Sequence, residues 1–230
     1  MTAMEDYTFH PVAHIRSDFQ TKFGIPRQSG LAQSLLATVV FAPDYRAPEA
    51  LRGIEGFSHL WLLWGFSASK GWSPTVRPPR LGGNTRVGVF ASRSPFRPNP
   101  IGLSCVRLER VEQTADVGTV LIVSGADLMD GTPIFDIKPY LPYADCQPEA
   151  TGGFAAEAPH DLLEVDFPPE LLLRVPEDRR AGLCQALSCD PRPSYQDDPT
   201  RVYGMAFAGL DVRFRVDGAH LLVCDVLTAP

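Results

Sequence analysis

Short apolar runs rich in β-branched and aromatic side chains recur through the first part of the chain, separated by Gly, Pro and Asn. They occupy residues 34–42, 57–67, 85–92, 103–113, 119–128 and 132–141. Runs of this length and composition are typical of β-strands, and periodic helical stripes are scarce here. Because many short strands must avoid exposed edges, the pattern predicts an all-β barrel or closed sheet between residues 9 and 143.

The pattern changes at residues 146–160, where Ala, Gly, Pro and Glu follow one another without apolar periodicity, as in a linker. The remaining chain predicts a small α/β unit. Its expected elements are a strand at 162–167, a helix at 176–190 with Leu183 and Leu187 on one face, and strands at 201–227 around a turn at Asp217-Gly218. We therefore predict a mainly β fold with a barrel domain at 1–146, a linker at 147–160 and a small α/β C-terminal domain at 161–230.

The length and composition agree with a soluble protein that has a real core. A chain of 230 residues with 44% hydrophobic content can hold one sizeable domain and a smaller one. The first residues include Glu5 and Asp6 where a signal peptide would need a basic start and an apolar run, and no stretch reaches the roughly 18 apolar residues of a membrane span. We expect a cytoplasmic protein that does not bind membranes.

The cysteines and the absence of familiar motifs argue against several kinds of chemistry. Five scattered cysteines are an odd number, so we expect reduced, buried thiols and no metal site, although Cys184 and Cys189 lie close in sequence. The sequence has no G-x-x-x-x-G-K-[ST], G-x-G-x-x-G or H-E-x-x-H motif, which argues against ordinary nucleotide hydrolysis and dinucleotide redox chemistry. His59 lies in an apolar run and is expected to be a hydrogen-bonded core residue.

Positive charge is concentrated in one part of an acidic chain. The net charge is −6, yet residues 70–110 contain eight basic residues and one acidic residue. The basic residues are Lys70, Arg77, Arg80, Arg86, Arg93, Arg97, Arg107 and Arg110. Arginine suits bidentate contacts with phosphate or carboxylate and stacking on bases, so this basic segment predicts a polyanionic partner or an anionic ligand.

Three segments, two stiff loops and one longer stretch, carry polar groups suited to a site. The loops 77–84 ("RPPRLGGN") and 93–102 ("RSPFRPNPIG") pair prolines with glycines, which positions their arginines and permits close approach of a ligand. Segment 125–143 brings three aspartates beside a lysine and two tyrosines. An aspartate after a strand can accept a hydrogen bond from an ammonium or ribose hydroxyl, and a tyrosine ring can stack on a base.

Together these motifs resemble the TrmO-type (TsaA-like) tRNA methyltransferases. The resemblance rests on "HIRSDFQTKFGIPRQSGL", "GFSHLWLLWGF", "RPPRLGGNTRVGVFASRSPFRPNPIG", "DLMDGTPIFDIKPYLPYAD" and "DPRPSY". It implies a single-sheeted β-barrel with a small C-terminal domain, a homodimer, and use of S-adenosyl-L-methionine. The implied reaction is methylation of N6 of threonylcarbamoyladenosine at position 37, next to the anticodon of tRNA.

The resemblance also implies site residues. The cofactor would be bound by Ser29, Gly30, Leu31, Ser67, Ala68, Arg93, Cys105, Ala126, Asp127, Leu128 and Met129. Arg93 suits the cofactor carboxylate, and Asp127 suits a polar hydrogen of its amino-acid or ribose part. Asp136 is a candidate catalytic base with Tyr140 supporting the target base by stacking; structural pairing of Asp136 with Lys138 or a strand backbone is the alternative.

The anticodon arm of tRNA is the expected partner of the remaining polar residues. They are Arg77, Arg80, Arg86, Arg97, Lys138 and Tyr143. Two other functions stay open from the residues alone. One is a non-catalytic RNA-binding barrel that uses the same arginines, and the other is a small-molecule methyltransferase that acts on an anionic substrate.

Overall fold

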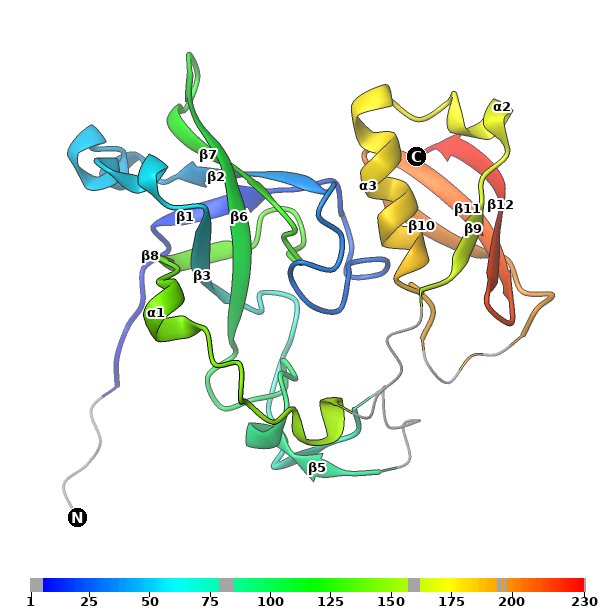
Figure 1. Cartoon of the computed structure of the whole chain (residues 1–230), viewed down its shortest axis with the longest axis horizontal. Coiled ribbons are helices and arrows are strands. Elements are labelled where there is room, and N and C mark those ends of the chain that lie inside the picture. Colours follow the sequence, from blue (N-terminus) through cyan, green and yellow to red (C-terminus); the bar gives the residue numbers. More distant parts are fainter. Residues whose placement is uncertain (1–5, 79–84, 157–161, 194–195, 197, 230) are drawn as a thin grey trace.

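The fold is given by a computed structural model, which describes residues 6–78, 85–156, 162–193, 196 and 198–229. Six antiparallel strands pair in the order β1-β2-β7-β6-β3-β8, and β8 pairs again with β1, so the sheet closes into a barrel (Figure 1). Their bounds are β1 Ala13–Arg16, β2 Leu36–Phe41, β3 His59–Gly65, β6 Ile101–Thr114, β7 Gly118–Ser124 and β8 Pro133–Pro139. The predicted mainly β fold is confirmed.

Alternation of side chains explains how these strands fill the barrel. In β3, Leu60, Leu62 and Trp64 are buried inside, and the residues between them face outward. Each fully buried leucine contributes roughly 1.5–3 kcal/mol relative to an exposed one. The inward residues of all six strands share one apolar cluster with Leu51, from the short helical turns between β2 and β3. These turns are 3-10 helices at Pro43–Tyr45, Pro48–Leu51 and Ile54–Gly56.

The chain leaves the barrel between β3 and β6 and forms a separate small layer (Figure 1). This layer contains the two-stranded sheet β4 (Thr75–Val76) and β5 (Val87–Gly88), followed by a 3-10 helix at Val89–Ala91. The prediction of a full strand at 85–92 is therefore wrong. The hydroxyl and N–H of Ser92 both bond to the carbonyl of Val89, which closes a local turn in place of a strand ladder.

The C-terminal unit is a four-stranded sheet of order β10-β11-β12-β9 with α3 packed on one face. Its elements are β9 Glu164–Asp166, α2 Pro169–Leu172, α3 Glu177–Ser188, β10 Tyr203–Phe207, β11 Leu210–Asp217 and β12 His220–Thr228. The predicted turn after Asp217 is present at Gly218, where φ is 56°. A second tight turn joins β10 to β11, with left-handed φ values at Ala208 and Gly209, and it was not predicted.

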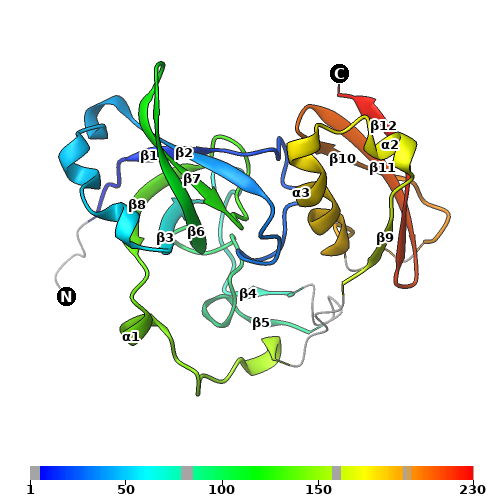
Figure 2. The ribbon, with the colours of Figure 1, turned by 45° about the horizontal axis from the view of Figure 1, so that its top comes forward.

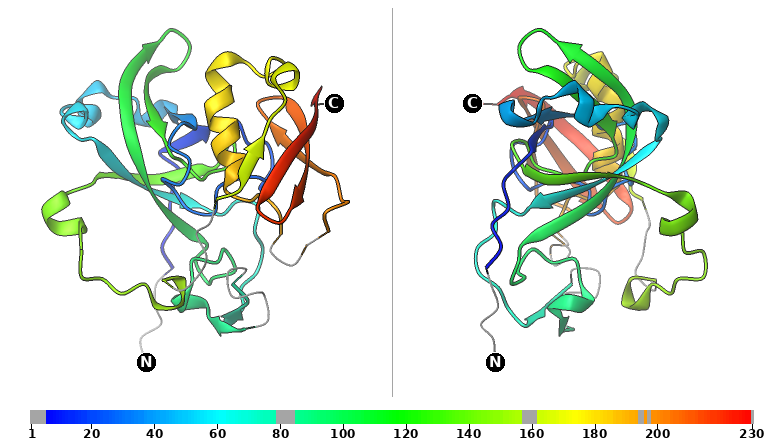
Figure 3. Two further views of the ribbon diagram at one scale, coloured as in Figure 1. Left: turned by 45° about the vertical axis from the view of Figure 1, so that its right-hand side comes forward. Right: turned by 90° about the vertical axis from the view of Figure 1, so that its left-hand side faces the viewer.

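The two halves are joined through residues 17–35, an irregular segment between β1 and β2. Figures 2 and 3 show this segment, in blue, between the barrel and α3. Phe19, Ala32 and Leu35 belong to the same apolar cluster as the interior of the C-terminal sheet and α3. The core of the C-terminal unit therefore includes side chains from the first part of the chain, which the expected division into 1–146, 147–160 and 161–230 does not convey.

The connection between the halves follows a long outer path. After β8 the chain forms α1 (Pro142–Asp145) and then passes the β4–β5 sheet, with one 3-10 helix at Gly153–Ala155 (Figure 2). Residues 147–156 are mostly exposed and form turns and this short helix, with no strand. Within the described residues, no helix has the length and apolar character needed to cross a membrane.

The cysteines and His59 differ in part from expectation. All five cysteines are free; Cys105, Cys184 and Cys189 are partly buried, whereas Cys146 and Cys224 are exposed, so the prediction of buried thiols is wrong for the last two. Their positions explain this: Cys146 follows the surface helix α1, and Cys224 lies on the outer face of β12. His59 is only half-buried, with Nδ1 2.9 Å from the hydroxyl oxygen of Ser58, because it occupies an outward position of β3.

Candidate active site

The site begins where β6 and β7 separate at one end of the barrel. β7 ends at Ser124, opposite Arg107, so the part of β6 before Arg107 extends beyond its β7 partner. The N–H of Cys105 in this part donates to the hydroxyl of Ser29, at 3.1 Å. The 17–35 segment thus takes the place of a strand neighbour here, and exposed backbone edges of this kind are suited to ligand recognition.

Asp127 lies at the same place, three residues after β7. Its Oδ1 accepts a hydrogen bond of 2.5 Å from the hydroxyl of Ser104, which in turn accepts one of 2.9 Å from Nε1 of Trp64. Ser104 is fully buried at an inward position of β6. The bonds form a chain from the apolar barrel interior to the carboxylate, so Asp127 is held in a defined orientation.

Burial raises the pKa of the Asp127 carboxyl above its usual value. The hydrogen bonds from Ser104 and from the backbone, including that of Ser29, act in the opposite direction, as does the charge of Arg93. Because the net shift is upward, the charged carboxylate is not fully compensated in the free protein. A ligand with an ammonium group or a hydroxyl donor would stabilise it.

Two glycines bring the surrounding loops into close contact. The N–H of Gly30 donates to the carbonyl of Gly125 at 2.8 Å, and both residues have left-handed φ values, 80° and 73°. A Cβ atom at Gly125 would lie 3.2 Å from the Cα of Gly30, so glycine is required there. Leu31, beside this crossing, is 44% exposed and offers an apolar surface at the opening.

Arg93 reaches the site from residues 66–100, the segment that leaves the barrel between β3 and β6. Its Nη1 donates to Oε1 of Gln28 at 2.6 Å, and its charge acts on Asp127. The guanidinium is otherwise exposed and able to pair with an anion. The structure therefore brings together four of the expected cofactor residues, Ser29, Arg93, Cys105 and Asp127, with Gly30 and Leu31 next to them.

The side chains next to Asp127 in the sequence contribute less to the site itself. Ala126 and Leu128 are buried in the barrel, so they support the loop from inside. The carbonyl of Leu128 accepts the hydroxyl of Ser17, and the carbonyl of Met129 accepts that of Thr132. These bonds hold the loop that follows β7.

Ser67 and Ala68 occupy a different place. Both are exposed just after β3, and Ser67 lines an open, mainly apolar pocket of about 290 Å³. Its walls include Tyr7, Phe9, Phe66, Ile101, Pro133 and Phe135. Among the described residues, no polar contact joins Ser67 or Ala68 to the Asp127 group.

The candidate catalytic residues lie on the outer surface of the barrel. In the strand register, Leu63 of β3 is opposite Asp136, and Trp61 is opposite both Lys138 of β8 and Cys105 of β6. Because Leu60 and Leu62 point inward, this row of residues points outward. Asp136 and Lys138 therefore share a face with Cys105, whose N–H donates to Ser29 of the 17–35 segment.

The structure contains the pairing that was the alternative to catalysis by Asp136. Oδ2 lies 2.7 Å from Nζ of Lys138, and Oδ1 accepts the N–H of Ile137 at 2.9 Å. Both side chains are about half exposed, so the ion pair itself contributes little stability. The role of Asp136 as a base stays a prediction.

Tyr140 lies in an aromatic group on the same face. Its ring centroid is 5.8 Å from that of Trp61 and 6.2 Å from that of His59. Trp61 is oriented by a 3.1 Å hydrogen bond from Nε1 to Asp145 of α1. Burial, first, and then nearby thiols and Asp145 raise the pKa of Tyr140, so its phenol stays neutral and can stack or donate a hydrogen bond.

Cys105 is a neutral component of this face. Burial raises the pKa of its thiol, and the charge of Asp145 adds to the effect. A thiol with a raised pKa is a poor nucleophile. Its contribution to the site is therefore the backbone N–H and the packing surface of the side chain.

The expected tRNA contacts divide into exposed and structural residues. Arg77, Arg86 and Tyr143 are exposed, although Nη1 of Arg86 also donates to the hydroxyl of Thr75. Arg97 is half-buried and donates to the carbonyls of Ser92 and Ser94, so it holds its own loop together. Arg80 lies outside the described residues.

Two groups of residues at or beside the site were not predicted from the sequence. Ser104 and Trp64 complete the Asp127 hydrogen bonds, and the signal for Ser104 is a hydroxyl at an inward position of an otherwise apolar strand. Trp72, Phe90 and Phe96 are exposed aromatic side chains within the basic segment. Their signal is the interleaving of aromatic residues with arginines.

A closed barrel with a partly buried carboxylate at one open end and an arginine-rich layer beside it defines a class of barrel protein suited to bind a small polar ligand and a larger anion. Two family models match the chain: the tRNA-methyltransferase O N-terminal domain at residues 14–146 and the TrmO C-terminal domain at residues 160–229. The chain therefore belongs to the tRNA-methyltransferase O (TrmO) family, as its motifs predict.

Known relatives resemble the whole chain. A protein of Escherichia coli strain K12 named tRNA (adenine(37)-N6)-methyltransferase is 42% identical over 226 residues, covering 94% of this chain and 96% of its own. A Pseudomonas aeruginosa protein named putative S-adenosylmethionine-dependent methyltransferase RcsF is 42% identical over 231 residues, covering 96% and 97%. A crystal structure of TrmO from Pseudomonas aeruginosa superimposes with a TM-score of 0.79 at 35% identity, covering 96% and 98%.

Proposed function

We propose that this protein methylates N6 of threonylcarbamoyladenosine at position 37 of tRNA, next to the anticodon, with S-adenosyl-L-methionine as methyl donor. The observation that carries the proposal is the partly buried carboxylate of Asp127, oriented by the hydrogen bond from Ser104 and placed beside Ser29 and Arg93 at the end of the barrel. Family membership supports the same reaction, because relatives are named tRNA (adenine(37)-N6)-methyltransferase and putative S-adenosylmethionine-dependent methyltransferase.

The residues at this site fit the proposed cofactor. Asp127 would pair with the amino group, and Arg93 would pair with the carboxylate. The backbone around Ser29 and Gly30 would contact the adenine, and Leu31 would cover its apolar surface. The bound cofactor supplies an electrophilic methyl group on a positively charged sulfur.

Methyl transfer of this kind requires mainly positioning. The C–N bond forms as the C–S bond breaks, and the sulfur keeps the electron pair, so the protein must align the three atoms. The attacking nitrogen belongs to a urea, whose N–H is more acidic than that of a simple amine. Asp136 is proposed to accept this proton; each carboxylate oxygen has a further lone pair, so the bond to Lys138 can persist.

The outer face and the basic segment would hold the tRNA. Tyr140, supported by Trp61, offers a ring for stacking on the target base. Lys138 and the exposed Arg77 and Arg86 are suited to phosphate contacts, and Tyr143 adds an exposed ring. Arg80 is included as a member of the basic segment of the sequence.

We also propose a cytoplasmic homodimer, on the resemblance to the family. Light scattering of the purified protein measures the assembly directly: a monomer at micromolar concentration would contradict the dimer without affecting the proposed chemistry.

Substrate choice provides the test of the reaction. Two forms of one threonine tRNA, bare and threonylcarbamoylated, are incubated with the protein and S-adenosyl-L-methionine, digested, and analysed by mass spectrometry. We expect one added methyl only on the hypermodified nucleoside. Bare tRNA lacks the acidic urea N–H and the threonyl carboxylate, and losing one charge-assisted contact alone costs roughly 1.5–3 kcal/mol.

The other outcomes separate the alternatives. Equal methylation of both tRNAs would contradict the proposed substrate choice. Methylation of neither, with tight and salt-dependent tRNA binding, would favour a non-catalytic RNA-binding barrel. Methylation of neither, without tRNA binding, would favour a small-molecule methyltransferase.

A further inference from the structure

The segment that carries Ser29 and Gly30 has no regular structure of its own. Residues 17–35 form neither helix nor strand, although loops longer than about 12–15 residues are uncommon in compact domains unless they have a function. A loop of this length does not define the position of a ligand-binding residue by itself. The contacts that fix its shape therefore decide whether the cofactor site is formed.

One of these contacts is a hydrogen bond to α3 of the C-terminal unit. The backbone N–H of Ser34 donates to Oε1 of Gln185 at 2.8 Å, across 151 positions of sequence. Ser34 immediately precedes Leu35, whose carbonyl accepts the N–H of Gly125 in the other loop of the site. Gln185 thus holds the backbone next to the point where the two site loops join.

Close packing accompanies this hydrogen bond. A Cβ atom at Gly182 of α3 would lie 2.9 Å from the side chain of Leu35 and 3.0 Å from the carbonyl oxygen of Ser34. At the other side of the loop, a Cβ at Gly24 would overlap the side chain of Met205 in β10. The segment is therefore in contact with the C-terminal unit both before and after Ser29.

The "DPRPSY" motif supplies a third contact. Nη2 of Arg27 donates to the carbonyl oxygen of Arg192 at 3.0 Å, two residues before Ser29. Asp190 fixes this turn, since its carboxylate accepts bonds from the N–H, Nε and Nη2 of Arg192. Asp190 itself has a left-handed φ of 51°.

An ion pair anchors the start of the segment. Nε of Arg179 in α3 lies 3.0 Å from Oδ2 of Asp18, whose carbonyl also accepts the N–H of Ala208. Phe19 then packs edge-on against Phe207, with ring centroids 5.4 Å apart. The contacts therefore continue along the segment from Asp18 to Leu35.

We propose that the C-terminal unit acts as a clamp on the cofactor loop, with Gln185 and the carbonyl of Arg192 as positioning groups for cofactor binding. The unit touches neither cofactor nor substrate in this proposal. It holds residues 24–35 in the shape that presents Ser29 and Gly30 to the β6–β7 opening. The identity of the ligand rests on the proposed function, whereas the mechanical role of the clamp does not.

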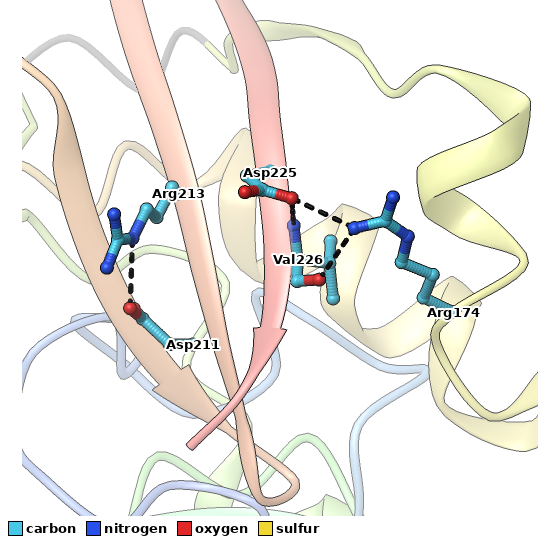
Figure 4. A network of polar contacts seen from close by, with 5 residues as sticks. All are labelled: Arg174, Asp211, Arg213, Asp225 and Val226. Carbon is cyan, nitrogen blue, oxygen red and sulfur yellow. Dashed lines mark hydrogen bonds and ion pairs between the residues drawn. The ribbon is translucent and has the colours of Figure 1, made fainter. Parts of the chain in front are cut away.

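The test compares four variants with the wild-type full-length chain. Gln185→Ala removes the acceptor of the Ser34 N–H, and Gln185→Glu keeps an acceptor oxygen at the same reach. Gly182→Ala favours the helix intrinsically but pushes against Ser34 and Leu35. Arg174→Ala is the matched control: it removes bonds to Asp225 and Val226 on the far side of the same unit (Figure 4).

Two readouts are measured for each variant. Calorimetric titration gives the affinity for S-adenosyl-L-methionine, and hydrogen exchange of the apoprotein reports the peptide that covers residues 24–35. For Gln185→Ala we expect roughly 3- to 10-fold weaker binding and faster exchange of this peptide. Steady-state rates should show a raised KM for the cofactor and a kcat within about twofold.

Rescue and controls complete the expected pattern. Gln185→Glu should recover most of the affinity, Gly182→Ala should lose it, and Arg174→Ala should retain it with unchanged exchange at 24–35. If wild-type protein binds the cofactor and folded Gln185→Ala binds it equally well, the clamp proposal is wrong. If Gln185→Ala does not fold, Gly182→Ala decides by the same two readouts.

The two proposals fail in different ways. If the wild-type protein does not bind S-adenosyl-L-methionine, the proposed function fails. The clamp is then decided by exchange alone, because faster exchange at 24–35 in Gln185→Ala but not in Arg174→Ala supports it. Equal exchange in all variants would overturn it.

Discussion

The barrel and the C-terminal unit differ in what they bury. Three polar side chains are buried in the described part of the chain, Ser104, Ser124 and Thr132, and all three lie in the barrel half. The interior of the C-terminal unit is formed by apolar residues and the ring of Tyr203. Buried polar groups are costly unless they are bonded, so their presence in the barrel half alone supports the proposed ligand site there.

The barrel half and the C-terminal unit also differ in how their surface arginines are paired. In the basic segment, Arg107 and Arg110 pair with Glu109 and Glu112, whereas among the described residues no ion pair involves the exposed Arg77, Arg86 or Arg93. In the C-terminal unit, Arg213 pairs with Asp211 and Arg174 pairs with Asp225 (Figure 4). This difference supports the proposal that the barrel half binds the ligand and the polyanion and that the C-terminal unit holds it in shape.

The largest expected effect concerns the border between the two regions. Phe19→Ala removes a buried ring that lies in the first part of the sequence but packs in the C-terminal core. We expect a loss of about 3–5 kcal/mol in the free energy of unfolding, measured by chemical denaturation. Phe90→Ala, at an exposed position, should change it by less than about 0.5 kcal/mol. A small effect of Phe19→Ala would mean that the segment is not part of that core.

The second prediction separates binding from stability within the barrel. Asp127→Asn keeps the shape and the acceptor for Ser104 but removes the charge. Affinity for S-adenosyl-L-methionine should fall about 10- to 150-fold, the equivalent of roughly 1.5–3 kcal/mol. The free energy of unfolding should stay equal or rise, because a poorly compensated charge is lost. Asp225→Asn, in the C-terminal unit, should leave the affinity unchanged.

The third prediction compares the two arginine-bearing surfaces. Replacing Arg77 and Arg86 by alanine should reduce the salt slope of tRNA binding by about one to two, because two phosphate contacts are lost. Replacing Arg213 and Arg215, on the C-terminal sheet, should leave the slope unchanged. Binding of labelled tRNA is measured from low to moderate salt. An unchanged slope in the first variant would show that Arg77 and Arg86 do not contact the polyanion.

The smallest expected effect is a pH dependence. A raised carboxyl pKa in the fold means that the unfolded chain loses its proton first, so this group lowers stability as pH rises above about 4. Denaturation of wild-type protein and Asp127→Asn across this range should show the wild type losing stability relative to the variant. Cofactor affinity should rise over the same range as Asp127 becomes charged. A pH-independent difference would contradict the pKa shift.

The sequence predicted which segments form strands better than it predicted which elements lie next to one another. Alternation located β2, β3, β6, β7 and β8, but β1 is only four residues long and pairs on both sides to close the ring. No local sequence pattern predicts such a closing strand. The contact between Ser34 and Gln185 spans 151 residues, so it follows from tertiary packing alone.

The sequence predicted which residues lie at the site better than it predicted the role of each one. Ser29, Arg93, Cys105 and Asp127 do come together, as the motifs imply. Arginines in one loop look alike in sequence, yet Arg97 bonds to carbonyls while Arg77 is exposed. The difference depends on how the Pro-rich loop folds back, which only the three-dimensional structure reveals.

The central claim is that the cofactor binds where the 17–35 segment meets the opening between β6 and β7. The most direct measurement is a crystal structure of the protein with S-adenosyl-L-homocysteine. We expect density bordered by Ser29, Gly30 and Asp127, with the amino group of the ligand within hydrogen-bond distance of the Asp127 carboxylate. Density confined to the apolar pocket of Tyr7 and Phe135, without contact to Asp127, would contradict it.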